Sequence, residues 1–243
     1  MEQTKYSFIS NFYGGFAVVA LNGKWNYIDE QGNLLSDQWF DSCGFFNEGF
    51  AAVKFNGGYN FLDKQGNVIS DMLFDYCGSF HEGFATVILN HKWNFIDEQG
   101  NLLSKQWFDE CYNFSEGFAR VKLNKKWNFI DKQNNFIGEQ WFDECCYFYE
   151  GFAMVYINGR WNFINQQGNY LSNQWFDYCW NFHEGFATVK LNGKYNSIDC
   201  HGYLLSDAWF NSCSGIHNGI ATVIIDGKVK TINTKGEIIN GTN

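Results

Sequence analysis

The stretch GFAVVALNGKWNYID, residues 15–29, decides the fold of this 243-residue chain. Ala17 and Val19 hold positions that stay small or apolar in every later copy of the stretch, while the residues between them vary. This period of two predicts a β-strand with one buried face. Asn22-Gly23 then separates the strand from a second apolar run. Asn-Gly in that place predicts a type I′ hairpin turn, because both central residues need φ > 0.

The stretch recurs at an unbroken spacing of 34 residues, which is the signature of a repeat array. The copies open at Gly15, Gly49, Gly83, Gly117, Gly151, Gly185 and Gly219. We predict one all-β repeat domain over 1–243, with seven β-hairpin or three-stranded repeats in tandem. Its parts are an N-terminal partial repeat at 1–14, full repeats at 15–48, 49–82, 83–116, 117–150, 151–184 and 185–218, and a degenerate C-terminal repeat at 219–243.

The remainder of each repeat predicts further short β-structure and no helix. In the first copy, Gly32 lies in a loop at a left-handed position. Leu34–Ser36 is typical of a short third strand, and Trp39–Phe46 forms either a fourth short strand or an irregular return. A lone repeat buries too little apolar area to offset the entropy of ordering itself, so its neighbours must cover its faces.

Composition excludes several classes of partner. The formal net charge is −9 and the 17 lysines and arginines are scattered, so we expect no nucleic-acid binding. No apolar run approaches the ~20 residues that span a bilayer, so we expect no membrane insertion. The first five residues show no secretory signal, and we therefore expect a cytoplasmic protein.

The eight cysteines predict buried thiols and no disulfide framework. Equivalent positions are a whole repeat apart, which is wider than the ~4–7 Å Cα gap that a disulfide tolerates. We interpret the cysteines as small apolar residues in a reducing compartment, and without a C-x-x-C pair we expect no metal site. Six of them share one position, Cys43, Cys77, Cys111, Cys145, Cys179 and Cys213, and Cys146 and Cys200 are extras.

The pattern Gly-Phe-Ala-x-Val-x-x-Asn-Gly-Lys-Trp-Asn-x-Ile-Asp-x-x-Gly resembles the bacterial WG repeat, over essentially the whole chain. The name-giving tryptophan is matched by Trp25, Trp93, Trp127 and Trp161, replaced by Tyr59 and Tyr195, and lost at Val229. The resemblance implies a β-rich array in interaction or accessory roles, with no catalytic residues to transfer. A weaker resemblance is to choline-binding and toxin-type cell-wall repeats, which are secreted β-hairpin solenoids with shorter units.

One departure from the family pattern is systematic. Asparagine stands where the family has glycine after tryptophan, at Asn26, Asn60, Asn94, Asn128, Asn162 and Asn196. Asparagine tolerates φ > 0 better than other non-glycine residues, so we expect a left-handed kink or a bulge to persist there.

The two ends of the chain leave two architectures open. Tyr6 to Phe12 matches the last part of a repeat, and the seventh copy stops just before that part. In a closed, propeller-like ring the N-terminal segment would complete the last repeat. In an open superhelix the seventh copy, which loses aromatic residues, would be a polar cap. We favour the open superhelix.

Candidate binding residues come from a second aromatic series. Trp39, Trp107, Trp141, Trp175 and Trp209 each precede a phenylalanine. Adjacent strand residues face opposite ways, so the tryptophans either form an apolar stripe for a partner or pack against the neighbouring repeat. Strand positions that vary between copies are the second candidates, because a specific ligand must recognise what varies. These outward positions are Val18, Lys54, Arg120, Met154 and Tyr156, and we single out Arg120 and Tyr156 for binding.

Polar residues give little chemistry. Glu48, Glu82, Glu116, Glu150 and Glu184 precede the repeat glycine, and we interpret them as solvated turn residues, the alternative being cation binding inside a ring. His81, His183 and His217 fall near the same turn in three repeats. No nucleophile or phosphate-loop motif is present, so we expect no enzyme, no catalytic residue and no cofactor.

Three functional hypotheses remain. The first is a non-catalytic scaffold for protein–protein interaction or assembly. The second is a carbohydrate- or choline-type ligand module with aromatic clefts between repeats. The third is self-association into a structural assembly.

Overall fold

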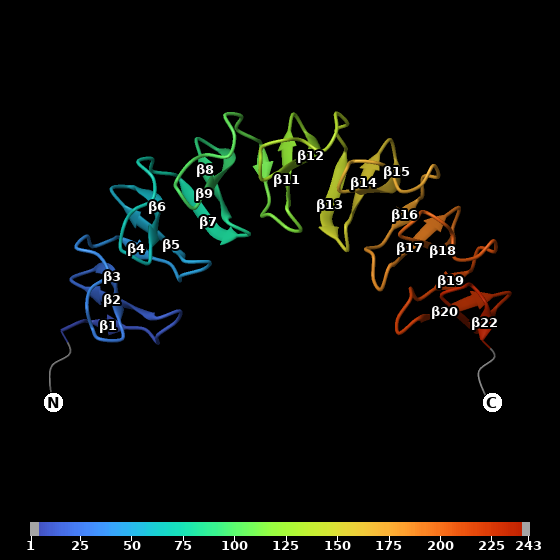
Figure 1. Ribbon diagram of the computed structural model, residues 1–243, viewed down its shortest axis with the longest axis horizontal. Helices are drawn as coiled ribbons and strands as arrows, with labels where there is room; N and C mark the ends of the chain where they lie inside the picture. The colour runs from blue at the N-terminus through green and yellow to red at the C-terminus, as the bar shows by residue number, and fades with distance from the viewer. Residues whose placement is uncertain (1–4, 240–243) are drawn as a thin grey trace. The chain divides into compact units, whose positions relative to one another are not determined.

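The computed structural model describes residues 5–239, which form β-strands joined by turns and bridges (Figure 1). Over these residues there is no helix, and hence none long and apolar enough to cross a membrane. The predicted all-β class is confirmed. The chain divides into two compact units, the first made of Met1–Gly117 with Lys132–Asn134 and the second of Phe118–Asp131 with Asn135–Asn243.

The first unit contains consecutive three-stranded antiparallel sheets. These are β1 (Phe8–Ile9), β2 (Phe16–Leu21) and β3 (Lys24–Asp29); β4 (Ser42–Cys43), β5 (Phe50–Phe55) and β6 (Gly58–Asp63); and β7 (Tyr76–His81), β8 (Phe84–Leu89) and β9 (Lys92–Asp97). The short strand β10 (Glu110–Cys111) follows. In each sheet the middle strand pairs with both of its neighbours in the sequence.

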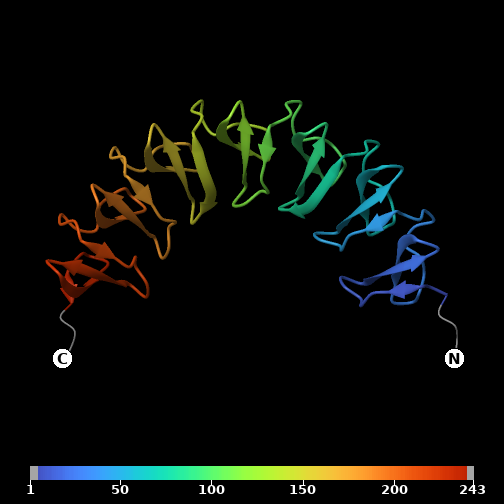
Figure 2. The same cartoon turned by 180° about the vertical axis from the view of Figure 1, so that it is seen from behind.

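The second unit repeats this arrangement, and Figure 2 shows its hairpins from behind. It begins with the hairpin β11 (Phe118–Leu123) and β12 (Lys126–Asp131). The next sheets are β13 (Glu144–Tyr149), β14 (Phe152–Ile157) and β15 (Arg160–Asn165), then β16 (Tyr178–Cys179), β17 (Phe186–Leu191) and β18 (Lys194–Asp199). The last sheet has four strands, β19 (Ser212–Cys213), β20 (Ile220–Ile225), β21 (Lys228–Asn233) and β22 (Ile238–Ile239).

The predicted hairpin turn is confirmed. Asn22 and Gly23 have φ of 54° and 77°, and Leu21 pairs with Lys24 across them. Where the glycine is missing the turn keeps its shape, since His91 and Lys125 adopt φ of 61° and 66°. At these two positions the backbone is in the left-handed region, which costs an L-residue about 1–2 kcal/mol relative to the right-handed region.

The variable face of the middle strand is covered in some repeats, so the prediction of a uniformly outward face was wrong, although Thr222 in β20 stays exposed. Val18 and Met154, assigned to that face, are only 8% and 9% exposed. Val18 packs with Phe40 in a cluster that includes Ala51 and Val53 of the next sheet. The sequence pattern missed this because the following sheet covers the variable face, and that face tolerates different side chains.

Sheets stack closely enough that some loops leave no room for a side chain. A Cβ on Gly66, in the loop after β6, would lie 2.0 Å from the carbonyl oxygen of Leu35 in the preceding repeat. The same loop one repeat later brings Gly100 against Ile69, where the distance would be 1.8 Å. The loop glycines therefore set how closely successive sheets approach.

The expected left-handed kink after tryptophan was wrong. Asn26 is a fully buried strand residue with negative φ. Its Nδ2 donates to the carbonyl oxygens of Ser36 and Gln38 at 2.7 and 3.1 Å, and its Oδ1 accepts from the Tyr27 amide at 2.8 Å. Asn60, Asn94 and Asn196 make the same three bonds in their repeats. The amide thus fastens the loop that follows the hairpin, which a glycine cannot do.

The segments that follow each hairpin mostly form isolated β-bridges and few regular strands. Leu34 makes a single bridge to Ile28, so the predicted third strand is absent from the first repeat, whereas its equivalent in the last sheet is β22. In Trp39–Phe46, Phe40 bridges to Trp25 and the chain then enters the next sheet as β4. In the first sheet β1 takes the place that β4 takes in the second. Ring closure, the superhelix and the repeat boundaries stay predictions.

The shared cysteine position lies in the core, as predicted. Cys77, Cys111, Cys145 and Cys179 are buried, and Cys43 and Cys213 are half-buried. Burial raises the pKa of the Cys43 thiol to about 12 and that of Cys111 well above its ordinary value. These thiols behave as small apolar residues.

Candidate functional site

The five candidate tryptophans are half-buried, and three of them lie against a core cluster. Trp39 packs with Tyr6 on the cluster of Ala17 and Val19. Trp107 and Trp209 pack on later clusters, and the rings of Trp141 and Trp175 lie 5.3 and 5.1 Å from those of Phe136 and Tyr170. The phenylalanine that follows each tryptophan is buried, as the alternation predicted. This placement favours the packing alternative, and a binding role for the series stays a prediction.

Arg120 and Tyr156 have different surroundings. The guanidinium of Arg120 lies over the rings of Trp127 and Tyr147, at 5.3 and 4.3 Å, and its Nη1 donates to the Cys145 carbonyl oxygen at 2.5 Å. Arg120 on β11 therefore contacts Trp127 of its own sheet and joins that sheet to β13 of the next one. Tyr156 contacts Trp161, with ring centroids 4.9 Å apart, and so joins the row of rings described below.

The turn glutamates are exposed, as predicted, and they also link successive repeats, which the sequence did not show. Glu48 has a φ of 47°, and its two carboxylate oxygens accept the amides of Glu82 and Gly83 in the next repeat at 3.1 and 3.0 Å. In the same way Glu150 accepts the amides of Glu184 and Gly185, and Glu184 accepts the amides of Asn218 and Gly219. Backbone amides from Asn218 and Gly219 lower the pKa of Glu184 below its usual value. The carboxylates pair the turns at one edge of the stack.

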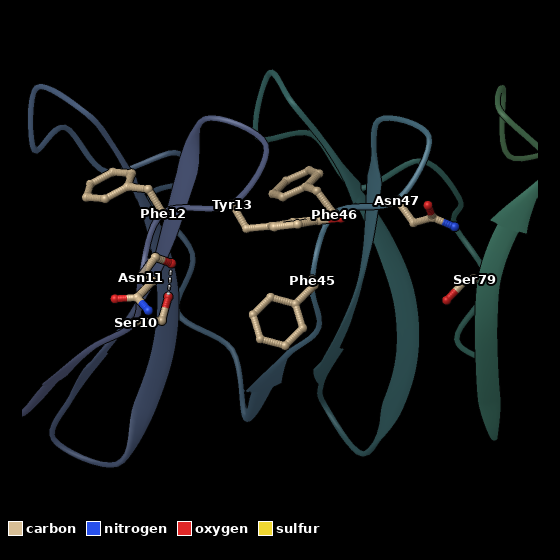
Figure 3. A pocket seen from close by; sticks show the side chains of 8 residues that line it. All are labelled: Ser10, Asn11, Phe12, Tyr13, Phe45, Phe46, Asn47 and Ser79. Atoms are coloured by element: carbon tan, nitrogen blue, oxygen red, sulfur yellow. Dashed lines mark hydrogen bonds between the residues drawn. The ribbon is translucent and has the colours of Figure 1, made fainter.

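Each unit has a hollow beside these turns, and the two hollows use the same place in the repeat. The N-terminal hollow has a volume of about 670 Å³ and is lined by Ser10, Asn11, Phe12, Tyr13, Phe45, Phe46, Asn47 and Ser79. Figure 3 shows Tyr13 extending from the first sheet toward the loop with Phe45 and Phe46. The rings of Tyr13 and Phe45 are 6.4 Å apart, and these residues are 66% and 70% exposed.

The C-terminal hollow has a volume of about 500 Å³ and uses the same loop five repeats later. It is lined by Trp180, Asn181, His183, Phe186, Thr188, Tyr195, Cys213, Ser214, Gly215, Ile216 and His217. Backbone bonds fix the loop against the middle strand, since the Trp180 amide donates to the Thr188 carbonyl at 2.9 Å as Ser10 does to Val18. The middle strand thereby positions whatever side chain the loop carries.

In another repeat a strand irregularity places the equivalent loop side chain outward. In β13 the register shifts between Cys145 and Phe148, so that strand contains one residue more than its partner. A bulge of this kind re-aims side chains. Tyr147 lies in it and is 41% exposed, whereas Phe148 returns to the core.

An aromatic row borders the C-terminal hollow. The row comprises Tyr156, Trp161, Tyr178, Trp180 and Tyr195, with successive ring centroids 4.9, 5.8, 4.6 and 5.9 Å apart. Tyr178 and Trp180 are 45% and 41% exposed. The Lys190 ammonium lies 5.1 Å from the Tyr195 ring and caps the row with a cation–π contact. The row offers rigid, amphipathic rings beside a cavity, which is suited to binding and supplies no reacting group of its own.

Sequence reasoning missed both hollows, although the signal is visible. The loop position of Phe45 varies through Asn11, Phe45, Ser79, Asn113, Tyr147, Asn181 and Gly215. The preceding position varies through Ser10, Gly44, Gly78, Tyr112, Cys146, Trp180 and Ser214. Variation next to a recurrent turn, Glu-Gly in five of the seven copies, marks a surface that the stack leaves open. Variation in the strands is less informative, because the neighbouring sheet covers part of it.

Comparisons with known proteins agree with the repeat pattern. A family model described as WG containing repeat matches residues 3–25, 27–59, 61–93, 95–127, 129–161 and 163–195. No curated protein matches the chain. Among solved structures, Hsv2p of Kluyveromyces lactis is 9% identical with a TM-score of 0.38, over 93% of this chain and 92% of that chain. Apo AztD from Citrobacter koseri is 12% identical with a TM-score of 0.38, over 96% and 84%. Scores this low carry no argument about function.

Proposed function

Since this chain belongs to the WG repeat family, we propose that it is a non-catalytic scaffold that binds a protein partner at the aromatic row. The observation that supports the proposal most is the exposure of Tyr178 and Trp180 beside the C-terminal hollow. Tyrosine and tryptophan are enriched among the residues that dominate interface energies, because each buries a large rigid area at low entropic cost.

The repeat architecture supports binding more than chemistry. Stacked sheets hold the loops at a fixed spacing, and the loops differ in sequence from one repeat to the next. Such an edge presents a row of distinct contacts to an extended partner. The net charge of −9 favours a partner segment with cationic and apolar side chains, because complementary charge steers association.

The test compares the affinity of the partner protein for the parent chain and for two variants, Trp180→Ala and Tyr203→Ala. Trp180→Ala removes the exposed centre of the row, and Tyr203→Ala is the matched control, since Tyr203 is 73% exposed and lies outside the row. We expect Trp180→Ala to weaken binding by about 2 kcal/mol or more, a loss of roughly 30-fold. Tyr203→Ala is expected to bind as the parent does. Equal affinity for both variants would reject the aromatic row as the binding surface.

A second candidate is a carbohydrate- or choline-type ligand. The observation that favours it is the combination of exposed rings with the polar side chains of Asn181 and Ser214 in one hollow. Rings flanked by hydrogen-bonding groups suit sugar faces, and an aromatic cluster suits a quaternary ammonium. Titrating glycans or choline while recording tryptophan fluorescence separates the candidates. A saturable change that Trp180→Ala abolishes supports the ligand module, and an unchanged spectrum supports the protein scaffold.

A further inference from the structure

We propose that His183, Glu184 and His217 bind one Zn²⁺ ion at the turn edge of the second unit. The ligand atoms of these three residues all lie within 4.8 Å of one another. His183 Nε2 and His217 Nδ1 are each 3.7 Å from Glu184 Oε1. Two ligands bound to one tetrahedral zinc at about 2.1 Å are roughly 3.4 Å apart, so both histidines are already near ligating distance of the shared carboxylate.

The repeat itself brings the two histidines together. His183 and His217 are 34 residues apart and hold the same position before the turn, so stacking sets their rings side by side. Their centroids are 5.7 Å apart with planes inclined by 12°. The side chains are 55% and 74% exposed, which leaves them free to turn onto a common ion. The same position elsewhere holds Tyr13, Asn47, His81, Ser115 and Tyr149, which gives no other adjacent histidine pair.

The third ligand is already oriented. The Asn218 and Gly219 amides donate to Glu184 Oε1 and Oε2 at 3.0 and 3.1 Å, which holds the carboxylate between the two turns. Hydrogen bonds to a ligating carboxylate of this kind fix its direction. Each oxygen keeps a lone pair beyond its amide bond.

The donor set selects the metal. Two imidazoles and one carboxylate suit zinc, and Ca²⁺ or Mg²⁺ require more oxygen ligands than the cluster offers. Three protein ligands leave a fourth position for water, which the exposure of both histidines permits. The ion would join the turn before β17 to the turn before β20, and so fasten the last sheet to its neighbour. His183 and His217 also line the C-terminal hollow, so a bound ion would lie next to the aromatic row.

The experiment measures Zn²⁺ binding by isothermal titration and native mass spectrometry on the full chain after chelator treatment. We expect one Zn²⁺ per chain, and no binding of Mg²⁺ at the same concentration. His183→Ala and His217→Ala are each expected to weaken binding at least 10-fold. His81→Ala is the matched control, because His81 holds the same position with no histidine beside it, and it should bind zinc as the parent does.

Both histidines are exposed, so their replacement should leave the core intact. Circular dichroism of each variant checks that a loss of zinc binding does not result from unfolding. Parental affinity in the double variant His183→Ala/His217→Ala would overturn the proposal, as would the absence of stoichiometric zinc in the parent. Equal weakening by His81→Ala would likewise overturn it, since that result describes scattered surface binding and no defined site.

Discussion

Replacing Gly100 by alanine tests whether contact between successive sheets sets the stability of the array. Gly100 has a φ of 83°, and an added Cβ would lie 1.8 Å from the carbonyl oxygen and 2.7 Å from the carbonyl carbon of Ile69. Both atoms belong to the backbone of the preceding repeat, so no side-chain rotation relieves the clash. One of the two loops has to move.

Gly32 provides a control with the same backbone and a different neighbour. It occupies the same loop position in the first repeat with a φ of 83°, and its added Cβ would meet nothing within 4 Å. Gly32→Ala therefore incurs only the left-handed strain of an L-residue, about 1–2 kcal/mol. Gly100→Ala adds overpacking, typically 1–3 kcal/mol, for a total of roughly 2–5 kcal/mol. The difference between the variants isolates the contact between sheets.

The assay is urea unfolding followed by tryptophan fluorescence, with amide exchange to locate the loss. The free energy of unfolding should fall more in Gly100→Ala than in Gly32→Ala, and amides in β8 and β9 should lose protection. If the two variants lose equal stability, the close approach of Gly100 to Ile69 contributes nothing and the reasoning about stacked sheets fails.

Three further results are expected. His91→Gly should raise stability by about 0.5–1 kcal/mol in thermal unfolding, because relief of left-handed strain exceeds the added freedom of the unfolded chain; a lower melting point would contradict this. Arg120→Ala should cost about 2–4 kcal/mol in urea, whereas Arg160→Ala, which breaks an exposed ion pair with Asp177, should cost about 0–1 kcal/mol; equal losses would refute the buried role of Arg120. Burial raises the pKa of Glu82, but hydrogen bonds from Lys132 and the Gly117 amide outweigh it and bring the pKa below the usual 4.5. The stability that Glu82 contributes is therefore complete above pH 4.5 and is lost as the pH falls through the lowered pKa of the folded state. In Glu82→Gln the free energy of unfolding should therefore depend less steeply on pH below 4.5, which urea unfolding at a series of pH values measures.

The local structure could be predicted because its signals are short-range. Asn22-Gly23 specifies its turn through the φ values of two residues, and the alternation after Gly15 specifies a strand. The asparagine at Asn26 was misread because its role depends on Ser36 and Gln38, whose approach no local rule describes. From the sequence alone, an asparagine whose buried side-chain amide bonds three backbone groups cannot be distinguished from one that adopts φ > 0.

The candidate site could not be predicted because it depends on which faces the stack covers. Alternation in β2 distinguishes a constant face from a variable one, and it leaves open whether another sheet lies over the variable face. Since the second face is covered, Val18 became core and Arg120 became part of the sheet packing. The histidine cluster needed one further fact, that stacking places residues 34 apart side by side.

The turn glutamates give a physical reason to propose recognition at the loops beside them. A non-glycine residue at φ near 50° is strained, and Glu48 is held there by the two amides that its carboxylate binds in the next repeat. The turn is thus fixed from one side by its neighbour and from the other by the middle strand. Backbone bonds therefore hold the loop that precedes it whatever side chains it carries, so Phe45 and Tyr147 can occupy one loop position and Trp180 the position before it. A loop whose backbone is fixed while its side chains vary suits binding, because preorganisation lowers the entropic cost of association.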